Sequence, residues 1–140
     1  MSGRIISATS AVDQVMAEII ANTIFREVKE HRELVLSSVL SSEWFSLAAK
    51  RKLLTIAVEK FNLLDGRKKS QLESDLKKVM DYRNAFAHGT LAHNGEVQQL
   101  HYFEGTPQRA TLDDAYFEQL ERSFLAAWEL LEEIQQAVKG

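Results

Sequence analysis

The stretch TLDDAYFEQLERSFLAAWELLEEIQQAVK, residues 111–139, carries large apolar residues at steps of three and four positions. These residues are Phe117, Leu120, Phe124, Leu125, Trp128, Leu131 and Ile134. The steps follow the period of an amphipathic α-helix, and two acids after Thr111 suit the positive end of a helix dipole. The stretch therefore predicts a long helix with one apolar face, and such a face needs other helices to cover it.

The N-terminal part of the chain repeats this period. Apolar residues recur in helical steps over residues 12–28, with Ser10 as the expected N-cap. The segment VLSSVLSSEWF, residues 35–45, is ambiguous, because it could extend this helix or form a short helix of its own. One helix is predicted here, and a second remains open.

Two further helices are predicted in the middle of the chain. One covers residues 47–61, with Ser41 or Ser42 as its cap and Gly66 as the left-handed residue that ends it.

The other middle helix starts near Ser70, with Glu73 as the second member of a capping box, and stops at Gly89. Beyond Gly89, turn signals at Asn94-Gly95 and at residues 105–107 enclose a β-compatible run, residues 97–103. The sequence thus predicts an all-α fold, a single domain over residues 1–140 with four to five helices and a small β-hairpin before the last helix.

Composition removes several functional classes. The chain has 140 residues without cysteine, which excludes disulfides, thiolate zinc sites and cysteine nucleophiles. No apolar run approaches the roughly 20 residues that span a bilayer, and the N-terminus lacks a secretory pattern, so we expect a cytoplasmic protein. His88, His93 and His101 match no zinc spacing, and we expect neither a metal nor a cofactor.

Charge is unevenly distributed along the chain. Its net value of -3 argues against strong non-specific binding to nucleic acid. However, residues 50–83 hold ten Lys or Arg against five Asp or Glu, whereas residues 113–138 hold seven acids and one base. The basic segment, which includes Lys77 and Lys78, could face an RNA substrate, or it could be ordinary surface charge.

The most unusual short segment is DYRNAFAHG, residues 81–89, in the last two turns of the third long helix. At about 100° per residue, Asp81, Asn84 and His88 share one face, while Arg83 lies about 140° away from His88. A site that uses both Arg83 and His88 would therefore need another element or a second copy of the helix.

These residue types suit cleavage of a phosphodiester. Imidazole, with an ordinary pKa near 6.5, can exchange a proton at neutral pH, and a guanidinium can hold two phosphate oxygens. In RNA the 2′-hydroxyl supplies the nucleophile. His88 would be the acid or base, Arg83 would stabilise charge, and Asn84 would orient the ring or the phosphate, with Tyr82 beside them to line the site.

A purely structural interpretation stands beside this one. A histidine before glycine at a helix end can interact with the last carbonyl groups and with the dipole, and Arg83 could pair with an acid on a neighbouring helix. Spacing alone does not separate the two interpretations.

The segment RNAFAH, residues 83–88, resembles the signature of the HEPN family of small helical domains, in which an Arg and a His are separated by four to six residues. The chain is also similar to the bacterial group related to mannitol-operon repressors. The residues that carry this second similarity are Phe45, Ser46, Arg51 or Lys52, Leu53 and Leu54.

The resemblance implies a HEPN-like helical bundle and a homodimer that joins two Arg–His pairs. It implies either a metal-independent endoribonuclease of the toxin or defence type, with an antitoxin or regulatory protein as a further partner, or a non-catalytic regulatory module. Toxins that a nucleotidyltransferase silences often have Tyr two residues after the His, where this chain has Thr90. The departure weakens that particular pairing and leaves Arg83 and His88 in place.

Overall fold

The computed structural model describes residues 2–26, 32–40 and 45–139. The molecule is mostly helical, as predicted. The elements follow the chain as α1 (Ser2–Thr23), α2 (Arg32–Val35), a π-helical turn η2 (Leu36–Leu40), α3 (Leu47–Lys60), α4 (Gly66–His88), strands β1 (Thr90–Asn94), β2 (Val97–Glu104) and β3 (Thr106–Thr111), and α5 (Asp114–Lys139). Short α2 and η2 show that part of the ambiguous segment forms a helix of its own.

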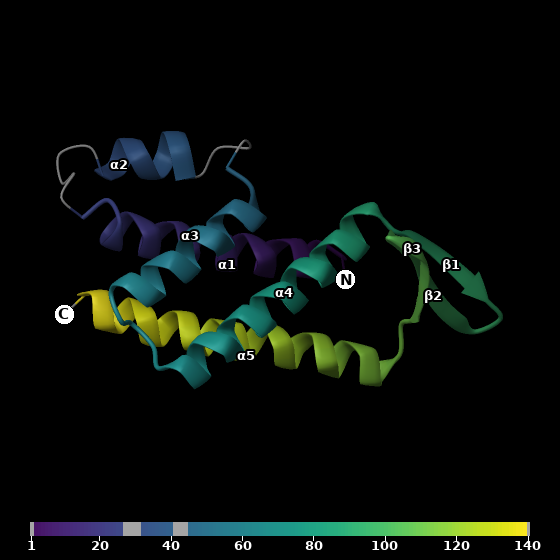
Figure 1. The fold of residues 1–140 in the computed structure, drawn as a ribbon. Coiled ribbons are helices and arrows are strands. Elements are labelled where there is room, and N and C mark those ends of the chain that lie inside the picture. Colours follow the sequence, from purple (N-terminus) through teal and green to yellow (C-terminus); the bar gives the residue numbers. More distant parts are fainter. Residues whose placement is uncertain (1, 27–31, 41–44, 140) are drawn as a thin grey trace.

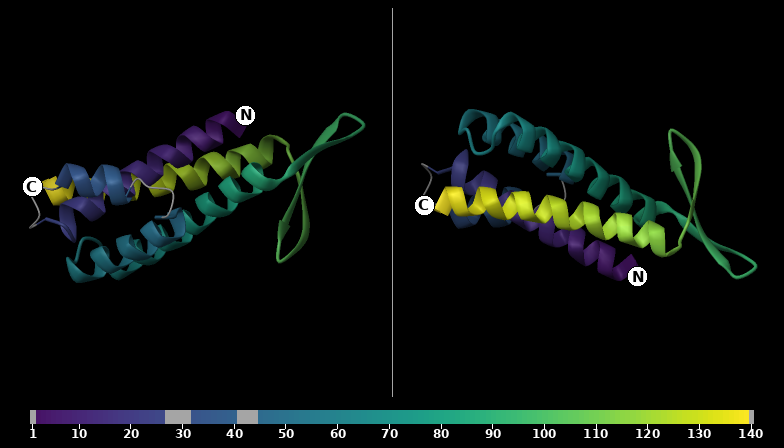
Figure 2. Two further views of the ribbon diagram at one scale, coloured as in Figure 1. Left: turned by 90° about the horizontal axis from the view of Figure 1, so that it is seen from above. Right: turned by 90° about the horizontal axis from the view of Figure 1, so that it is seen from below.

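Helices α1, α3, α4 and α5 pack along one another, and α2 lies outside them near α1 and α3 (Figure 1). Helix α4 runs toward the sheet, while α1 and α5 run away from it, and the sheet projects past the ends of α4 and α5 (Figure 2). The main core is built from apolar side chains of these four helices. Its fully buried members include Val12, Met16, Ile19, Leu54, Val58, Leu72, Val79, Leu131 and Ile134.

A smaller apolar cluster joins α1 to η2 through Ala17, Ile20, Ala21 and Leu40. A part-buried ion pair ties α1 to α3, because Lys50 Nζ lies 2.7 Å from Asp13 Oδ1 and Lys50 is only 3% exposed. Lys50 therefore belongs to the scaffold and is unavailable to a ligand.

The expected helix starts need correction. Ser10 lies inside α1, which begins at Ser2, and Thr9 bonds back to the Ile5 carbonyl instead of opening a helix. Ser41 and Ser42 lie outside the described residues, and the N-cap of α3 is Ser46, whose side chain accepts from Ala49 N at 3.1 Å. For α3, a serine a few residues further along has the same capping chemistry, so the sequence pattern did not single out Ser46.

The turn between α3 and α4 also differs from expectation. Gly66 is the first residue of α4, and the left-handed residue is Asn62, at φ 55°. Asp65 caps α4 by accepting from Lys68 N at 2.8 Å, so the helix starts four residues before Ser70. Asn tolerates the left-handed region and Asp is a strong N-cap, which together allow a short turn.

The predicted hairpin is a three-stranded antiparallel sheet in the order β1-β2-β3. Both expected turns are present, with Gly95 and Gly105 at positive φ. The strand that the prediction missed, β3, contains Pro107 and lies at the edge of the sheet, where a missing N–H is tolerated.

Candidate functional site

Helix α4 holds Arg83, Asn84 and His88 in its last two turns, where the sequence predicted them. Arg83 is half-buried, whereas Asn84 and His88 are exposed. Arg83 Nη1 donates to Asn84 Oδ1 at 3.3 Å. Within the part of the chain that the structure describes, His88 makes no side-chain hydrogen bond and no ion pair. The structure thus leaves the imidazole free for a ligand or for a second chain.

Helix α4 ends directly after His88, where its backbone lies close to the sheet. Gly89 N donates to the Ala85 carbonyl at 2.8 Å. A Cβ on Gly89 would collide with that carbonyl oxygen and lie 2.8 Å from Leu100 Cδ1 of β2. Leu100 is itself buried. Glycine at position 89 therefore lets the sheet sit against the end of the helix that carries the motif.

Aromatic side chains support the opposite side of this helix end. Tyr116 of α5 packs against Tyr82, with ring centroids 5.6 Å apart and nearly perpendicular rings, and against Phe86 at 6.2 Å. Phe117 extends the cluster at 5.6 Å from Tyr116. Aromatic rings thus pack this helix end against α5, while the Asn84 and His88 side chains remain exposed.

Burial changes the acidity of two hydroxyls in the cluster. Burial raises the pKa of Tyr82, with a hydrogen bond to Ser123 acting in the opposite direction and Tyr102 adding to the increase. Burial also raises the pKa of Tyr116, with smaller contributions from Tyr82 and Tyr102. All three tyrosines of the chain therefore gather where α4, α5 and β2 meet.

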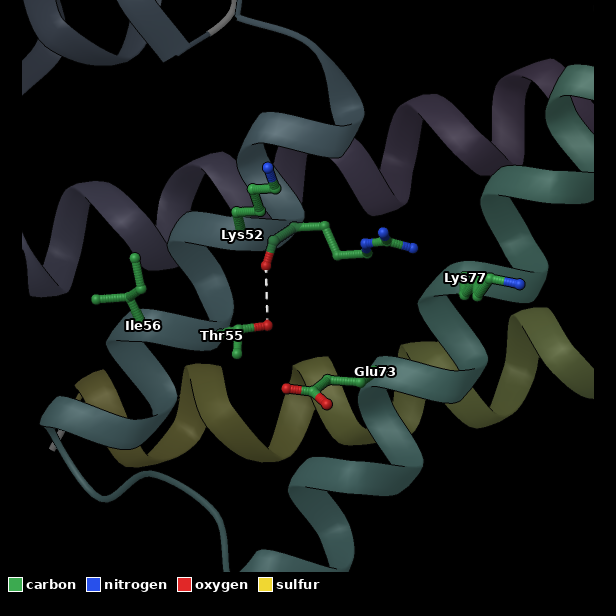
Figure 3. A pocket seen from close by; sticks show the side chains of 6 residues that line it. Lys52, Thr55, Ile56, Glu73 and Lys77 are labelled. Atoms are coloured by element: carbon green, nitrogen blue, oxygen red, sulfur yellow. Dashed lines mark hydrogen bonds between the residues drawn. The ribbon is translucent and has the colours of Figure 1, made fainter.

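A shallow groove of about 430 Å³ runs between α3 and α4. Its lining residues are Arg51, Lys52, Thr55, Ile56, Glu73 and Lys77. Figure 3 shows the Glu73 carboxylate pointing from α4 into this space, opposite Thr55 of α3, whose hydroxyl donates to the Arg51 carbonyl at 3.0 Å. The groove thus combines three cations with one acid.

Lys77 connects this groove to the motif. Residues 77, 81, 84 and 88 follow one another at steps of four, three and four, so they line one face of α4. Lys77 Nζ lies 3.7 Å from Asp81 Oδ2, a distance typical of a weak surface pair. Lys78, the other lysine predicted to bind substrate, is exposed on α4 but is absent from the groove lining.

Several cations of the basic segment are already paired. Lys50 binds Asp13, Lys68 binds Glu133 at 2.7 Å, and Lys69 binds Glu59. Arg51 and Lys52, by contrast, make no ion pair with any described acid. Two cations without a described ion-pair partner therefore line the groove. Lys60, Arg67 and Lys78 are exposed elsewhere on α3 and α4.

Sequence reasoning found the motif and missed the groove. Thr55 and Ile56 joined no pattern, and Glu73 was interpreted as a capping residue, because their proximity depends on how α3 packs against α4. Among the described residues, no group of three or more His, Asp or Glu side chains is placed to hold a metal ion. The helices described here also include none that is long and apolar enough to cross a membrane.

Comparison with family models, curated proteins and solved structures finds no match to this chain. The site must therefore be interpreted from its own chemistry.

Proposed function

We propose that the protein is a HEPN-like, metal-independent endoribonuclease that acts as a homodimer. One observation carries the proposal: the helix end that presents Arg83, Asn84 and His88 is packed through Tyr82 and Phe86, so the exposed Asn84 and His88 side chains have no evident structural task. Polar groups that stability does not require, on a segment with a catalytic spacing, are candidates for chemistry.

The reaction follows from the groups that RNA and the motif supply. The 2′-hydroxyl of a nucleotide attacks its own 3′-phosphate, and His88 of one protomer takes the hydroxyl proton. The bond from phosphorus to the 5′-oxygen of the next nucleotide breaks, and His88 of the partner subunit donates a proton to that oxygen. The products are a 2′,3′-cyclic phosphate and a 5′-hydroxyl.

Arg83 and Asn84 would act on the charge that builds up at phosphorus. A guanidinium can donate two parallel hydrogen bonds to phosphate oxygens. Asn84 Oδ1 accepts from Arg83, so its amide N–H groups remain as donors. The pair therefore offers a positive charge and neutral donors side by side.

Two further features support an RNA substrate and a dimer. Lys77 and the unpaired Arg51 and Lys52 lie near one groove, where they could hold the phosphates of the strand beyond the cut. Arg83 and His88 point about 140° apart on an ideal helix, which favours a site completed by a second chain. The proposal implies cytoplasmic action, and a toxin or defence role would require an inhibitory protein partner.

Cleavage of a mixed RNA in EDTA tests the proposal. Wild type, His88→Ala and the control His93→Ala, which changes an exposed histidine of β1, are compared after light scattering shows equal mass and circular dichroism shows equal folding. We expect His88→Ala to lower the cleavage rate by at least about 100-fold, the contribution of a general acid or base, and His93→Ala to leave it unchanged. Product ends are read by their sensitivity to phosphatase and kinase.

The second candidate is a non-catalytic regulatory module in which residues 83–88 form a contact between helices of two chains. The half-burial of Arg83 within its own chain gives this residue a structural role, which favours a non-catalytic interpretation of the motif. It predicts that folded wild type cuts no RNA and that His88→Ala weakens the dimer, which the same light-scattering experiment detects.

A further inference from the structure

The two faces of the three-stranded sheet have different chemistry. On β2, Leu100 is buried and Tyr102 is half-buried, while their neighbours His101 and Phe103 are exposed. Since side chains alternate along a strand, the even-numbered residues of β2 face the helices and the odd-numbered residues face away from them.

The pairing register identifies the residues that share the outward side. His101 is opposite Arg109 on β3 and Thr90 on β1, and Phe103 is opposite Pro107. Directly opposed residues in an antiparallel pair lie on the same face. We define the outer face as Thr90, Ala92, Val97, Gln99, His101, Phe103, Pro107, Arg109 and Thr111.

The outer face combines an aromatic ring with positive charge. Phe103 is 74% exposed, the largest exposure among the exposed large apolar side chains of the described residues. Arg109 is exposed on β3, two positions from the residue that pairs with Phe103. His101, which pairs with Arg109, adds a ring N–H group that can donate a hydrogen bond. The nine residues of the face include no Asp or Glu.

This face begins directly beside the candidate catalytic residues. Gly89 alone separates His88 from Thr90, and Thr90 pairs with His101. The sheet extends beyond the helix ends, away from the bundle (Figure 2). A strand of nucleic acid bound at His88 could therefore continue onto the outer face without crossing the core.

We propose that the outer face is a platform for unpaired bases of single-stranded RNA, an inference that rests on the proposed function. Phe103 stacks on one base, and Arg109 contacts the adjoining phosphate. Aromatic rings on an exposed sheet suit this task because every base has a stacking surface, and the absence of acids suits a polyanion. The substrate class is then RNA that is unpaired next to the cut.

A second copy of the chain fits the outer face less well. In a two-fold contact the same face is used on both chains, so neither outer face would supply an acid to pair with the Arg109 of the other. A polyanion instead neutralises this charge.

Binding of an uncleavable strand tests the platform separately from catalysis. The probe is a fluorescein-labelled mixed 12-mer with 2′-O-methyl riboses, which lacks the attacking hydroxyl, and its blunt duplex is the comparison. Anisotropy titrations use wild type, Phe103→Ala and Arg109→Gln. The matched control is Phe61→Ala, which removes an exposed ring at the C-terminus of α3, remote from the sheet.

We expect Phe103→Ala to weaken single-strand binding by about 5- to 140-fold, the range for loss of one stacked base, with an unchanged salt dependence. Arg109→Gln should reduce the slope of log affinity against log salt by about 0.7, the value for one phosphate contact on a single strand. Phe61→Ala should bind like wild type, and the duplex should bind more weakly than the single strand.

Three results would overturn the platform: no binding of the single strand by wild type, equal affinities of Phe103→Ala and Phe61→Ala, or a change of oligomeric mass in Phe103→Ala that shows a protein contact. Binding that depends on Phe103 in a protein that cuts no RNA would keep the platform and remove the ribonuclease. RNA cleavage that proceeds at the same rate in Phe103→Ala would keep the ribonuclease and remove the platform.

Discussion

The two ends of α4 use their polar residues differently. At the first end, Asp65 caps the helix, and Lys68 and Lys69 pair with acids of α5 and α3. At the last end, the one side-chain hydrogen bond of Arg83 within the described structure is to its neighbour Asn84, and His88 has no hydrogen bond or ion pair there. The charges of the first end pair with neighbouring helices, whereas the last end leaves Arg83 half-buried and His88 exposed, both without an ion pair to a described residue.

Aromatic packing explains how the last end can leave these groups free. Tyr82 and Phe86 press against Tyr116 of α5, so the apolar contact that fixes α4 lies on a different side from Asn84 and His88. Exposed ion pairs contribute little to stability, whereas packed rings contribute more. The difference teaches that the motif end is fixed by rings and that its polar face is available for function.

Substitution of the two glycines at the ends of α4 should give the largest difference in the free energy of unfolding. Gly89→Ala adds a Cβ that collides with the Ala85 carbonyl, so we expect a loss of about 1 to 3 kcal/mol in the free energy of unfolding. Gly66→Ala meets no atom within 4 Å and should gain about 0.4 to 1 kcal/mol. Urea unfolding measures both, and equal effects would contradict a tight joint between helix and sheet.

Substitution of a buried acid in the middle of α4 should give the next largest change in the free energy of unfolding. Asp75 is 3% exposed, and its Oδ1 accepts from Gln71 at 3.0 Å while its Oδ2 has no partner within the described structure. Because a buried carboxylate costs more than a neutral amide of the same shape, and the amide oxygen can still accept from Gln71, Asp75→Asn should raise the free energy of unfolding by about 1 kcal/mol at pH 7. A destabilised variant in the same urea assay would show that the carboxylate has a partner, such as bound water.

The smallest expected effect is on the pH dependence of stability, and it involves Tyr116 of α5, which packs against the last end of α4. Burial raises the pKa of Tyr116 above the value of about 10 in the unfolded chain. Its contribution to stability is complete below pH 10 and declines as pH rises, because only the unfolded chain then loses the proton readily. Tyr116→Phe should therefore flatten the decline in stability between pH 9 and about 11, and parallel profiles of the two proteins would contradict this.

Periodicity predicted the long elements well and their ends poorly. The stretch 111–139 contains α5 because one apolar face repeats over seven turns, a signal that no single residue can mask. Helix starts depend on one side chain, and residues that can cap a helix, such as Ser and Asp, recur along these segments, so Ser10 and Ser70 were wrong. The third strand was missed because Pro107 argues against a strand unless it lies at an edge.

The residues of the candidate site also differ in how far the sequence predicted their positions. Arg83, Asn84 and His88 lie within one six-residue segment, so their shared helix end followed from spacing alone. Phe103 and Arg109 lie six residues apart and share a face only through the turn at Gly105 and the register of β2 and β3. The sequence alone could therefore not predict that these two side chains share a face.

By itself, the sequence determined a mostly helical chain, a β-region between its last two long helices and the position of its motif on a helix end, because each depends on local periods and turn residues. Only the tertiary structure decided that Lys50 is buried while His88 is free, that α3 and α4 enclose a groove, and that the sheet turns Phe103 and Arg109 outward. The physical reason is that burial and pairing depend on residues far apart in the chain, whose approach is set by packing of the whole core.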